Sequence, residues 1–362
     1  MSNGYYIGLG NCGPITISKQ STNAHSLIVG ISGSGKSVRL TEIERKIVKD
    51  GGTVVAIDLN GTHYDVEGCN HINVLEQGIG IKLMDNNPQE IPSNSTEKRN
   101  MISYAADVLS AGQRFGPRQK MALRTAIEFA MDNGYESEME GIRDGLLYQE
   151  KNKHADSVHE CLWDILEGDY FKAETELIKE NKINIISLRG INPSTQKILV
   201  EIFLSMLWKN QRQDGTDSKP LTVTLDEFQT LNFHKGALLA ELLTESRKYN
   251  LTLILATQTL ARYSKEQLAL LNQTAVKLFF LPAKSDTATI SKMIEHGKEK
   301  YWFGVLEKLK VGQAVAIGAL ETGSDNRSLS RPVITKSEYT QKIDTSNIST
   351  ENDNTLENCG FE

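Results

Sequence analysis

The stretch HSLIVGISGSGKS, residues 25–37, decides the fold of this chain. Its first five residues form a compact apolar run that predicts a buried strand, and the run ends at Gly30. A helix is expected over 36–49, because Asp-Gly-Gly at 50–52 then stops it. The next apolar run, TVVAID at 53–58, predicts a second strand. Strand, helix and strand in this order form a βαβ unit, which implies a parallel sheet covered by helices.

The turn between the first strand and the helix matches the pattern G-x-x-x-x-G-K-S. Glycines at these positions let backbone N–H groups approach phosphate oxygens without a clashing Cβ, and the helix N-terminus points at the same anion. Lys36 can reach the β- and γ-phosphates, and the Ser37 hydroxyl can ligate Mg²⁺. A chance Gly/Ser turn is the alternative, but a strand precedes the motif and a helix follows it. The sequence therefore predicts a site for ATP and Mg²⁺ built from Gly30, Ser32, Gly33, Ser34, Gly35, Lys36 and Ser37.

Two carboxylates follow another apolar strand, LTVTL at 221–225. Asp226 and Glu227 are then expected at the carboxyl end of that strand, which is the edge where ligands bind in open α/β sheets. Asp226 is expected to hold Mg²⁺ with Ser37, and Glu227 to act as the general base that polarises the attacking water. An acidic helix cap would explain Asp226 alone. Adjacent carboxylates beside a phosphate-binding loop favour hydrolysis of ATP over transfer to an acceptor.

Two further polar groups follow the acidic pair. Gln258 comes just after the strand LTLILA at 251–256, which is expected to lie beside the strand of the phosphate-binding loop. Its amide can donate to the γ-phosphate and orient water, whereas the alternative is a polar turn residue. Arg247 precedes the same strand at a helix end. It is predicted to be an arginine finger for a neighbouring subunit, or else a cation that complements the helix dipole.

The rest of the chain repeats the strand and helix pattern on both sides of a helical stretch. Strands are expected at 183–188, 276–281, 312–318 and 331–335, and helices at 194–212, 235–248, 264–272 and 285–295. From about 66 to 180 the strand pattern fades, and helices are predicted at 97–110, 118–132 and 157–180. The fold class is therefore α/β, with a mostly parallel central sheet and a helical insertion. The expected organisation is a short extended N-terminal segment at 1–24, one domain at 25–341 and a tail at 342–362.

Composition is that of a globular protein and excludes fibrous or fully disordered classes. Of the 362 residues, 24% are charged and 39% are hydrophobic, and the formal net charge is −6. Five acidic residues and no basic ones fall within 344–362, so the acidic tail is expected to be disordered. Without those five, 41 acidic residues face 40 basic ones. The charge balance therefore argues against a protein that coats nucleic acid, but not against DNA in a pore.

Four separated cysteines, Cys12, Cys69, Cys161 and Cys359, are expected to be reduced thiols, and the seven histidines show no metal-ligand spacing. No apolar run approaches the roughly 18 residues that a membrane span needs, and the first residues lack the signal-peptide pattern. The chain is therefore expected in the cytoplasm, without direct membrane insertion. It would lie at the inner face of a membrane only through a partner protein.

Together, the motifs GISGSGKS, VVAIDLNG, INIISLRG, LTVTLDEF, ESRKYNLTLILATQ, NQTAVKLFFLPA and VGQAVAIG make the chain similar to the HerA/FtsK superfamily of P-loop ATPases. The resemblance spans roughly residues 25–320 and is strongest to HerA-type DNA translocases and to the motors of conjugation and type IV secretion. It implies a RecA-like core and a homo-oligomeric ring, usually a hexamer, that hydrolyses ATP between subunits and drives DNA or another polymer through its pore. By the same resemblance Arg247 is the finger that acts in trans, and Gln258 is the sensor.

The sequence thus predicts an ATP-hydrolysing ring motor that translocates DNA, in conjugative, phage or plasmid transfer or in genome processing. Two alternatives share the same core: a type IV secretion ATPase that drives protein or DNA export through a membrane partner, and an ATP-dependent assembly or defence component with slow turnover. The chain departs from larger members of the superfamily because only about 24 residues precede the first strand. Targeting is therefore expected from the 66–180 insertion, the acidic tail, or a membrane or nuclease partner protein.

Overall fold

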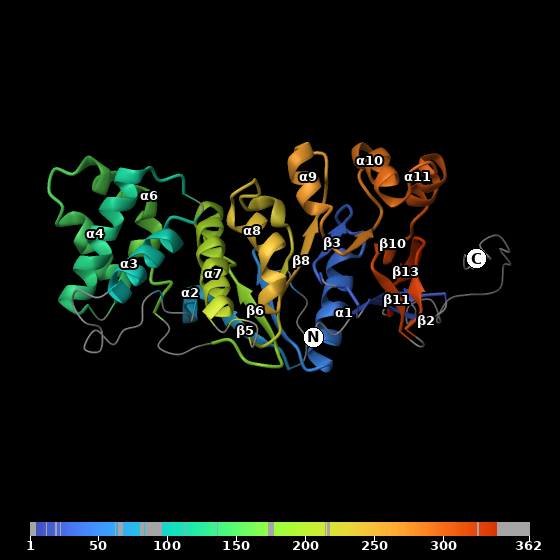
Figure 1. The fold of residues 1–362 in the computed structure, drawn as a ribbon, viewed down its shortest axis with the longest axis horizontal. Helices are drawn as coiled ribbons and strands as arrows, with labels where there is room; N and C mark the ends of the chain where they lie inside the picture. The colour runs from blue at the N-terminus through green and yellow to red at the C-terminus, as the bar shows by residue number, and fades with distance from the viewer. Residues whose placement is uncertain are drawn as a thin grey trace.

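The computed structural model describes residues 5–338 except 12, 19, 22, 62, 64–67, 80–82, 84–95, 112, 136, 173–176, 214, 216–217 and 324–325; the expected tail at 342–362 lies outside the described residues. Within the described part of the chain, one sheet holds thirteen strands in the order β12-β11-β2-β1-β13-β10-β9-β3-β8-β7-β4-β6-β5 (Figure 1). The strands are β1 (Tyr6–Gly10), β2 (Gly13–Ile17), β3 (Ser26–Val29), β4 (Thr53–Asp58), β5 (Asn70–Asn73), β6 (Ile183–Ser187), β7 (Leu221–Leu225), β8 (Leu251–Thr257), β9 (Val276–Phe279), β10 (Gln313–Gly318), β11 (Leu320–Thr322), β12 (Ser328–Leu329) and β13 (Val333–Lys336).

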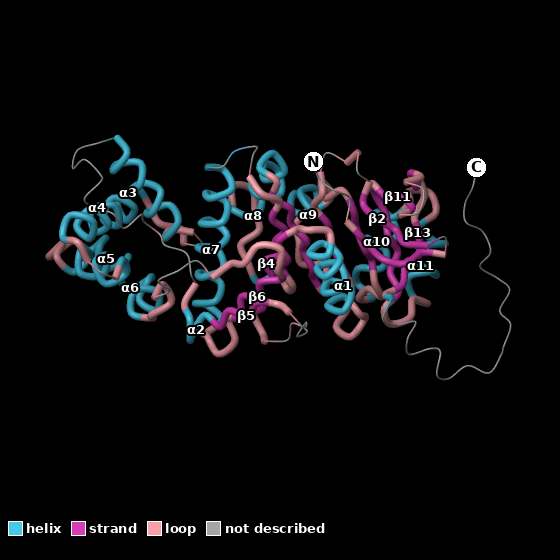
Figure 2. Tube along the Cα trace, turned by 90° about the horizontal axis from the view of Figure 1, so that it is seen from below, coloured by secondary structure: helices cyan, strands magenta, loops and turns pink. Residues whose placement is uncertain are grey.

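Helices surround this sheet and form a separate group at one end of it (Figure 2). The helices are α1 (Lys36–Lys49), α2 (Val74–Gln77), α3 (Thr96–Leu109), α4 (Pro117–Asn133), α5 (Glu138–Leu147), α6 (Lys153–Glu167), α7 (Pro193–Gln213), α8 (Leu238–Glu245), α9 (Lys265–Leu271), α10 (Lys284–Ile294) and α11 (Glu299–Glu307). Two short 3₁₀ turns, η2 (Phe228–Thr230) and η3 (Ser246–Tyr249), flank α8 in the sequence. No helix among the residues described above is both long enough and apolar enough to cross a membrane.

The half of the sheet from β9 to β5 is parallel, which confirms the expected α/β class with a parallel central sheet. Strand β3 lies between β8 and β9, so Val29 is level with Thr257 on one side and Phe279 on the other. Every residue of β3 is buried, as expected for a parallel strand covered on both faces. The carboxyl ends of β3, β7 and β8 therefore meet at one edge of the sheet.

The other half of the sheet is antiparallel and contains both early and late segments of the chain. Strand β10 runs antiparallel to β9. Strand β13 lies between β10 and β1 and runs antiparallel to both. The N-terminal segment that the sequence suggests to be a short extension thus supplies β1 and β2 to the same sheet. These strands are short and rich in glycine, so their apolar pattern is weak.

The two faces of the parallel half are covered by different helices. On one face, Leu40 and Ile43 of α1 pack in a cluster with Ile28 of β3. On the other face, Phe203 of α7 and Leu242 of α8 belong to the larger apolar core. Covering both faces removes the sheet from water and leaves its carboxyl edge as the place for polar side chains.

Helices α3 to α6 pack against one another at the end of the molecule beyond β5 (Figures 1 and 2). The helix expected over 157–180 ends earlier, at Glu167. Gly168 follows it with an extended backbone, φ −82° and ψ 124°, and a Cβ at that position would lie 2.4 Å from the Asp164 carbonyl oxygen. The chain therefore turns there and passes close to Ile79, whose N–H donates to the Tyr170 carbonyl at 2.7 Å.

Candidate active site

The loop after β3 is anchored by the ends of both neighbouring strands. The N–H of Gly30 donates to the Thr257 carbonyl at 3.2 Å, and the N–H of Ile31 donates to the Leu281 carbonyl at 2.9 Å. A Cβ at position 30 would lie 2.6 Å from the Cβ of Phe280, so only glycine fits between the strands. The start of the loop is thus fixed by the sheet itself.

The middle of the loop has the backbone form of an anion-binding turn. Gly33 and Gly35 have φ angles of 77° and 100°, a region that favours glycine. Ser32 is exposed, whereas Ser34 is buried and its Oγ donates to the Ile31 carbonyl at 2.7 Å. Gly35 directly precedes the 14-residue helix α1, whose N-terminus therefore opens onto the loop. A nest of this kind at a helix N-terminus stabilises phosphate.

Lys36 lies inside the loop, with its side chain turned back on it. The residue is only 5% exposed, and its Nζ donates to the Ile31 carbonyl at 3.0 Å. Burial lowers the pKa of Lys36, and the nearby carboxylates of Asp226 and Glu227 partly oppose that shift. The cation is thus held next to the loop where a phosphate would lie.

Ser37 and Asp226 meet at the first turn of α1. The Ser37 Oγ donates to Asp226 Oδ2 at 2.9 Å, although the two residues are 189 positions apart. Burial raises the pKa of Asp226, the charge of Glu227 adds to the rise, and the Ser37 hydroxyl and Lys36 oppose it. Hydroxyl and carboxylate oxygens are the ligands that Mg²⁺ prefers, and a buried carboxylate beside another one is stabilised by a divalent cation. These residues therefore fit Mg²⁺.

The described residues of this region include no larger cluster of ligating side chains. Among the described residues, no group of three or more His, Cys, Asp or Glu side chains could hold a metal ion. Mg²⁺ characteristically binds through one or two protein oxygens together with water and substrate phosphates. The Ser37 and Asp226 pair matches that pattern.

Glu227 has an uncommon backbone and two amide partners. Its φ and ψ are 58° and 37°, in the left-handed region that non-glycine residues seldom occupy. One carboxylate oxygen accepts from Gln258 Nε2 at 2.7 Å, and the other accepts from Gln229 Nε2. The two glutamines come from different elements, because Gln258 follows β8 and Gln229 lies in η2. The structure thus brings the expected base and the expected sensor together.

Gln229 is a residue that sequence reasoning missed. Its Oε1 is buried and accepts no hydrogen bond from the part of the chain that the structure describes, while its Nε2 donates to Glu227. The available signal was position alone: a polar residue two places after the base, in a stretch that turns sharply. Whether such a side chain points back toward the base depends on the left-handed backbone of Glu227, which sequence periodicity does not reveal.

Arg247 lies at the opposite edge of the sheet from the phosphate-binding loop. It is exposed in η3, immediately before β8, whereas the loop follows β3, and these two strands are parallel. The length of β8, seven residues, separates the two positions by about 20 Å. Within one chain, therefore, Arg247 does not contribute to the site that contains Lys36 and Glu227.

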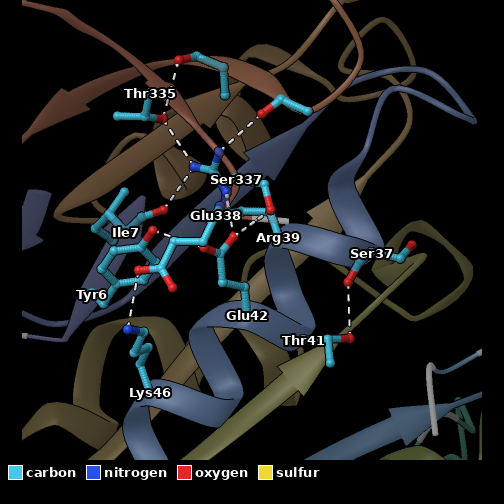
Figure 3. A network of polar contacts seen from close by, with 12 residues as sticks. Tyr6, Ile7, Ser37, Arg39, Thr41, Glu42, Lys46, Thr335, Ser337 and Glu338 are labelled. Carbon is cyan, nitrogen blue, oxygen red and sulfur yellow. Dashed lines mark hydrogen bonds and ion pairs between the residues drawn. The ribbon is translucent and has the colours of Figure 1, made fainter. Parts of the chain in front are cut away.

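A buried ion pair anchors α1 just beyond the loop. The Arg39 Nε lies 3.3 Å from Glu42 Oε2, and the two side chains are 0% and 2% exposed. Glu42 also accepts from the Tyr6 hydroxyl and from the Ser337 Oγ, each at 2.8 Å. Figure 3 shows that this network joins α1 to β1 and to the segment after β13. Sequence reasoning missed it, because a charged pair inside a helix usually faces solvent.

Comparisons with known proteins match this core to one family model and to solved structures of the same fold. A family model described as the central domain of the helicase HerA matches residues 10–207. The structure of VirB4 from Thermoanaerobacter pseudethanolicus is 16% identical, has a TM-score of 0.67, and the match covers 93% of this chain and 97% of that chain. No curated protein sequence matches.

The bacterial conjugative coupling protein TrwB has the same fold. Its unbound form is 17% identical with a TM-score of 0.65, and the match covers 92% of this chain and 88% of that chain. TrwB in complex with ADP and Mg²⁺ is 16% identical with a TM-score of 0.62, and the match covers 93% and 94% of the two chains. At this level of identity the likeness establishes the shared fold.

Proposed function

Since the chain belongs to the family of the HerA helicase central domain, we propose that it is an ATP-hydrolysing motor that translocates DNA. One observation carries the proposal: Lys36, the Ser37–Asp226 pair and the Glu227–Gln258 pair lie together at one edge of the sheet. The structural likeness to TrwB, a conjugative coupling protein, supports DNA as the polymer that is moved.

Each side chain at this edge has a distinct part in hydrolysis. Glu227 accepts the proton of a water whose oxygen attacks the γ-phosphorus, while the bond between that phosphorus and the bridging oxygen breaks. ADP and inorganic phosphate are the products. Gln258 leaves the carboxylate to donate to the γ-phosphate, which frees the Glu227 oxygen that faces the water. Lys36 exchanges the Ile31 carbonyl for a phosphate oxygen and neutralises its charge.

Mg²⁺ would be held by Ser37 and Asp226. When bound, it supplies positive charge to the β- and γ-phosphate oxygens. The complex of TrwB with ADP and Mg²⁺ supports this cofactor pair. In this proposal Asp226 stays ionised and Ser37 keeps its position at the first turn of α1.

We propose that the motor is a homo-oligomeric ring, usually a hexamer, with its sites between subunits. The placement of Arg247 supports this, because an exposed arginine far from its own site is available to a neighbour's site. The proposed location is the cytoplasm, with any contact to a membrane made through a partner protein.

The proposal is tested by measuring ATP turnover with and without single- and double-stranded DNA. We expect DNA to stimulate the wild-type protein. Lys36→Ala should abolish ATP binding, whereas Glu227→Gln should keep ATP binding and lower turnover about 10²- to 10⁴-fold. Lys49→Ala is the matched control, because Lys49 is an exposed residue at the far end of the same helix.

Two outcomes would contradict parts of the proposal. Turnover that no DNA stimulates, but that a membrane protein partner does, would reject DNA translocation in favour of a secretion ATPase. Biological activity that survives Glu227→Gln would reject hydrolysis as the driving step and favour an ATP-dependent assembly role.

A further inference from the structure

The turn that leads into β10 lies directly against the phosphate-binding loop. The N–H of Gly312 donates to the Ser34 carbonyl at 2.9 Å. A Cβ at Gly35 would lie 2.8 Å from the Gly312 nitrogen and 2.9 Å from its Cα, so no side chain fits between the two backbones. The segment 310–312 is therefore one wall of the loop, although almost 280 residues separate them in sequence.

Arg39 holds the segment 310–312 in place through its guanidinium. Its Nη2 donates to the Gly312 carbonyl at 3.0 Å, and its Nη1 donates to the Ile7 carbonyl at 2.9 Å and to Thr335 Oγ1 at 3.0 Å. Figure 3 shows Arg39 at the centre of these contacts. Both polar groups of Gly312 are thus hydrogen-bonded, its N–H to the loop and its carbonyl to Arg39. The wall is held in place by the fold, before any ligand binds.

The wall lies on the side of the loop away from the hydrolytic groups. In the sheet order β10-β9-β3-β8-β7, the strands that carry Gln258 and Glu227 are on one side of β3, and β9 and β10 are on the other. A nucleotide that lies across the loop with its γ-phosphate at Glu227 would therefore have its ribose and base on the side of β9 and β10.

Val311 presents an apolar side chain at this place. It is 65% exposed, so the packing of the core does not account for it. It directly precedes Gly312, and its neighbour Lys310 is also exposed. An exposed valine on a rigid wall at the nucleoside end of a phosphate site is suited to pack against a ribose or base.

We propose that the segment 310–312 forms the nucleoside-binding wall of the site, with Val311 packing against the ribose and base of the nucleotide. The inference rests on the proposed function, because it assumes that the phosphate-binding loop holds ATP. It assigns a protein contact to the ribose and base of the nucleotide, which the residues of the phosphate-binding loop do not reach.

Binding of ADP and of inorganic tripolyphosphate separates this wall from the phosphate site. We expect Val311→Ala to weaken ADP binding about 3- to 10-fold, as for the loss of one or two methyl contacts on one side. Tripolyphosphate has no nucleoside, so its affinity should stay within about twofold of wild type. Val311→Ile should keep ADP affinity. Lys36→Ala should weaken both ligands.

Controls keep a negative result informative. Val311 is exposed, so its variants should unfold at the wild-type temperature, and Leu147→Ala offers a matched change at an apolar residue that is 58% exposed on α5. Equal ADP affinity in Val311→Ala and wild type, or equal weakening of ADP and tripolyphosphate, would overturn the nucleoside wall alone. A wild-type protein that binds neither ligand would overturn the proposed function, and this inference with it.

Discussion

Glu227 combines a left-handed backbone with a carboxylate whose two oxygens both accept an amide N–H. A non-glycine residue in this conformation costs on the order of 1–2 kcal/mol. This cost falls on the residue proposed as the general base. With Glu227 in this conformation, η2 begins at the next residue and the side chain of Gln229 returns to the Glu227 carboxylate. Backbone strain at this position is thus part of how the carboxylate is placed.

His25 carries a prediction about pH. Burial lowers the pKa of His25 to about 4, the charge of Arg247 adds to this effect, and its Nδ1 accepts from the Leu253 N–H at 3.0 Å. The unfolded chain, with an ordinary histidine pKa of 6.5, binds the proton first as the pH falls. Stability should therefore decrease below about pH 6.5, and this residue should remove about 2 kcal/mol between pH 7 and pH 5.

Chemical denaturation at several pH values measures that effect. His25→Asn should lose about 2 kcal/mol less stability than wild type between pH 7 and pH 5, whatever its stability at pH 7. An equal loss in both proteins would show that another group causes the dependence.

Much of the site could be predicted at the residue scale. The pattern GISGSGKS predicts the geometry of a phosphate-binding loop. Asp226 and Glu227 follow an apolar strand whose carboxyl end must lie at the edge of the sheet where ligands bind. Gln258 could be placed because a buried strand precedes it. The partners Gln229 and Gly312 could not, because their contacts depend on a strained turn and on tertiary packing.

At the element scale, α1 carries a second prediction. Arg39 and Glu42 on this helix are fully desolvated, and together they join it to β1, to β13 and to the turn before β10. Arg39→Met leaves Glu42 as an uncompensated buried charge, so it should lower the free energy of unfolding by about 3–5 kcal/mol. Arg39→Met combined with Glu42→Met should recover part of that loss.

An exposed ion pair between the same helix and the segment after β13 is the control. Lys46 and Glu338 are 3.2 Å apart but 34% and 43% exposed, so Lys46→Met should cost less than about 1 kcal/mol. Denaturant titration compares the variants. A small loss for Arg39→Met, equal to that for Lys46→Met, would contradict a structural role for the buried pair.

Element boundaries were predicted where burial produces an unbroken apolar run. The helix expected over 36–49 and the strands expected at 53–58 and 221–225 match α1, β4 and β7. The strands β5, β11 and β12 have four residues or fewer, too few to show a period. Strand β1 pairs with β2, the next strand in the chain, and joins the rest of the sheet only through β13, a distant segment.

At the scale of the whole molecule, the opposite placement of Arg247 and Glu227 predicts complementation between subunits. Arg247→Ala should lower turnover about 10³- to 10⁵-fold, the contribution of an arginine finger, and Glu227→Gln about 10²- to 10⁴-fold. In a mixed ring, a site with Glu227 from one variant receives Arg247 from the other. About one quarter of the sites in a randomly mixed ring should then be active.

Co-expression of the two variants and a turnover assay on the mixed oligomers test this expectation. The control is a mixture of Glu227→Gln with Lys36→Ala, which both damage the same site and should not complement. Turnover no higher than that of the separate variants would reject Arg247 as a residue that acts in trans.

The pairing of β1 with β13 also determines when the sheet can finish folding during synthesis of the chain. Thr335 follows Arg39 by 296 residues, which a ribosome needs about 15–60 s to synthesise. Until then β1 has no β13 beside it, and the guanidinium of Arg39 has no Thr335 to bind. The nascent chain therefore has an open sheet edge for most of its synthesis, and the last strands to emerge close it.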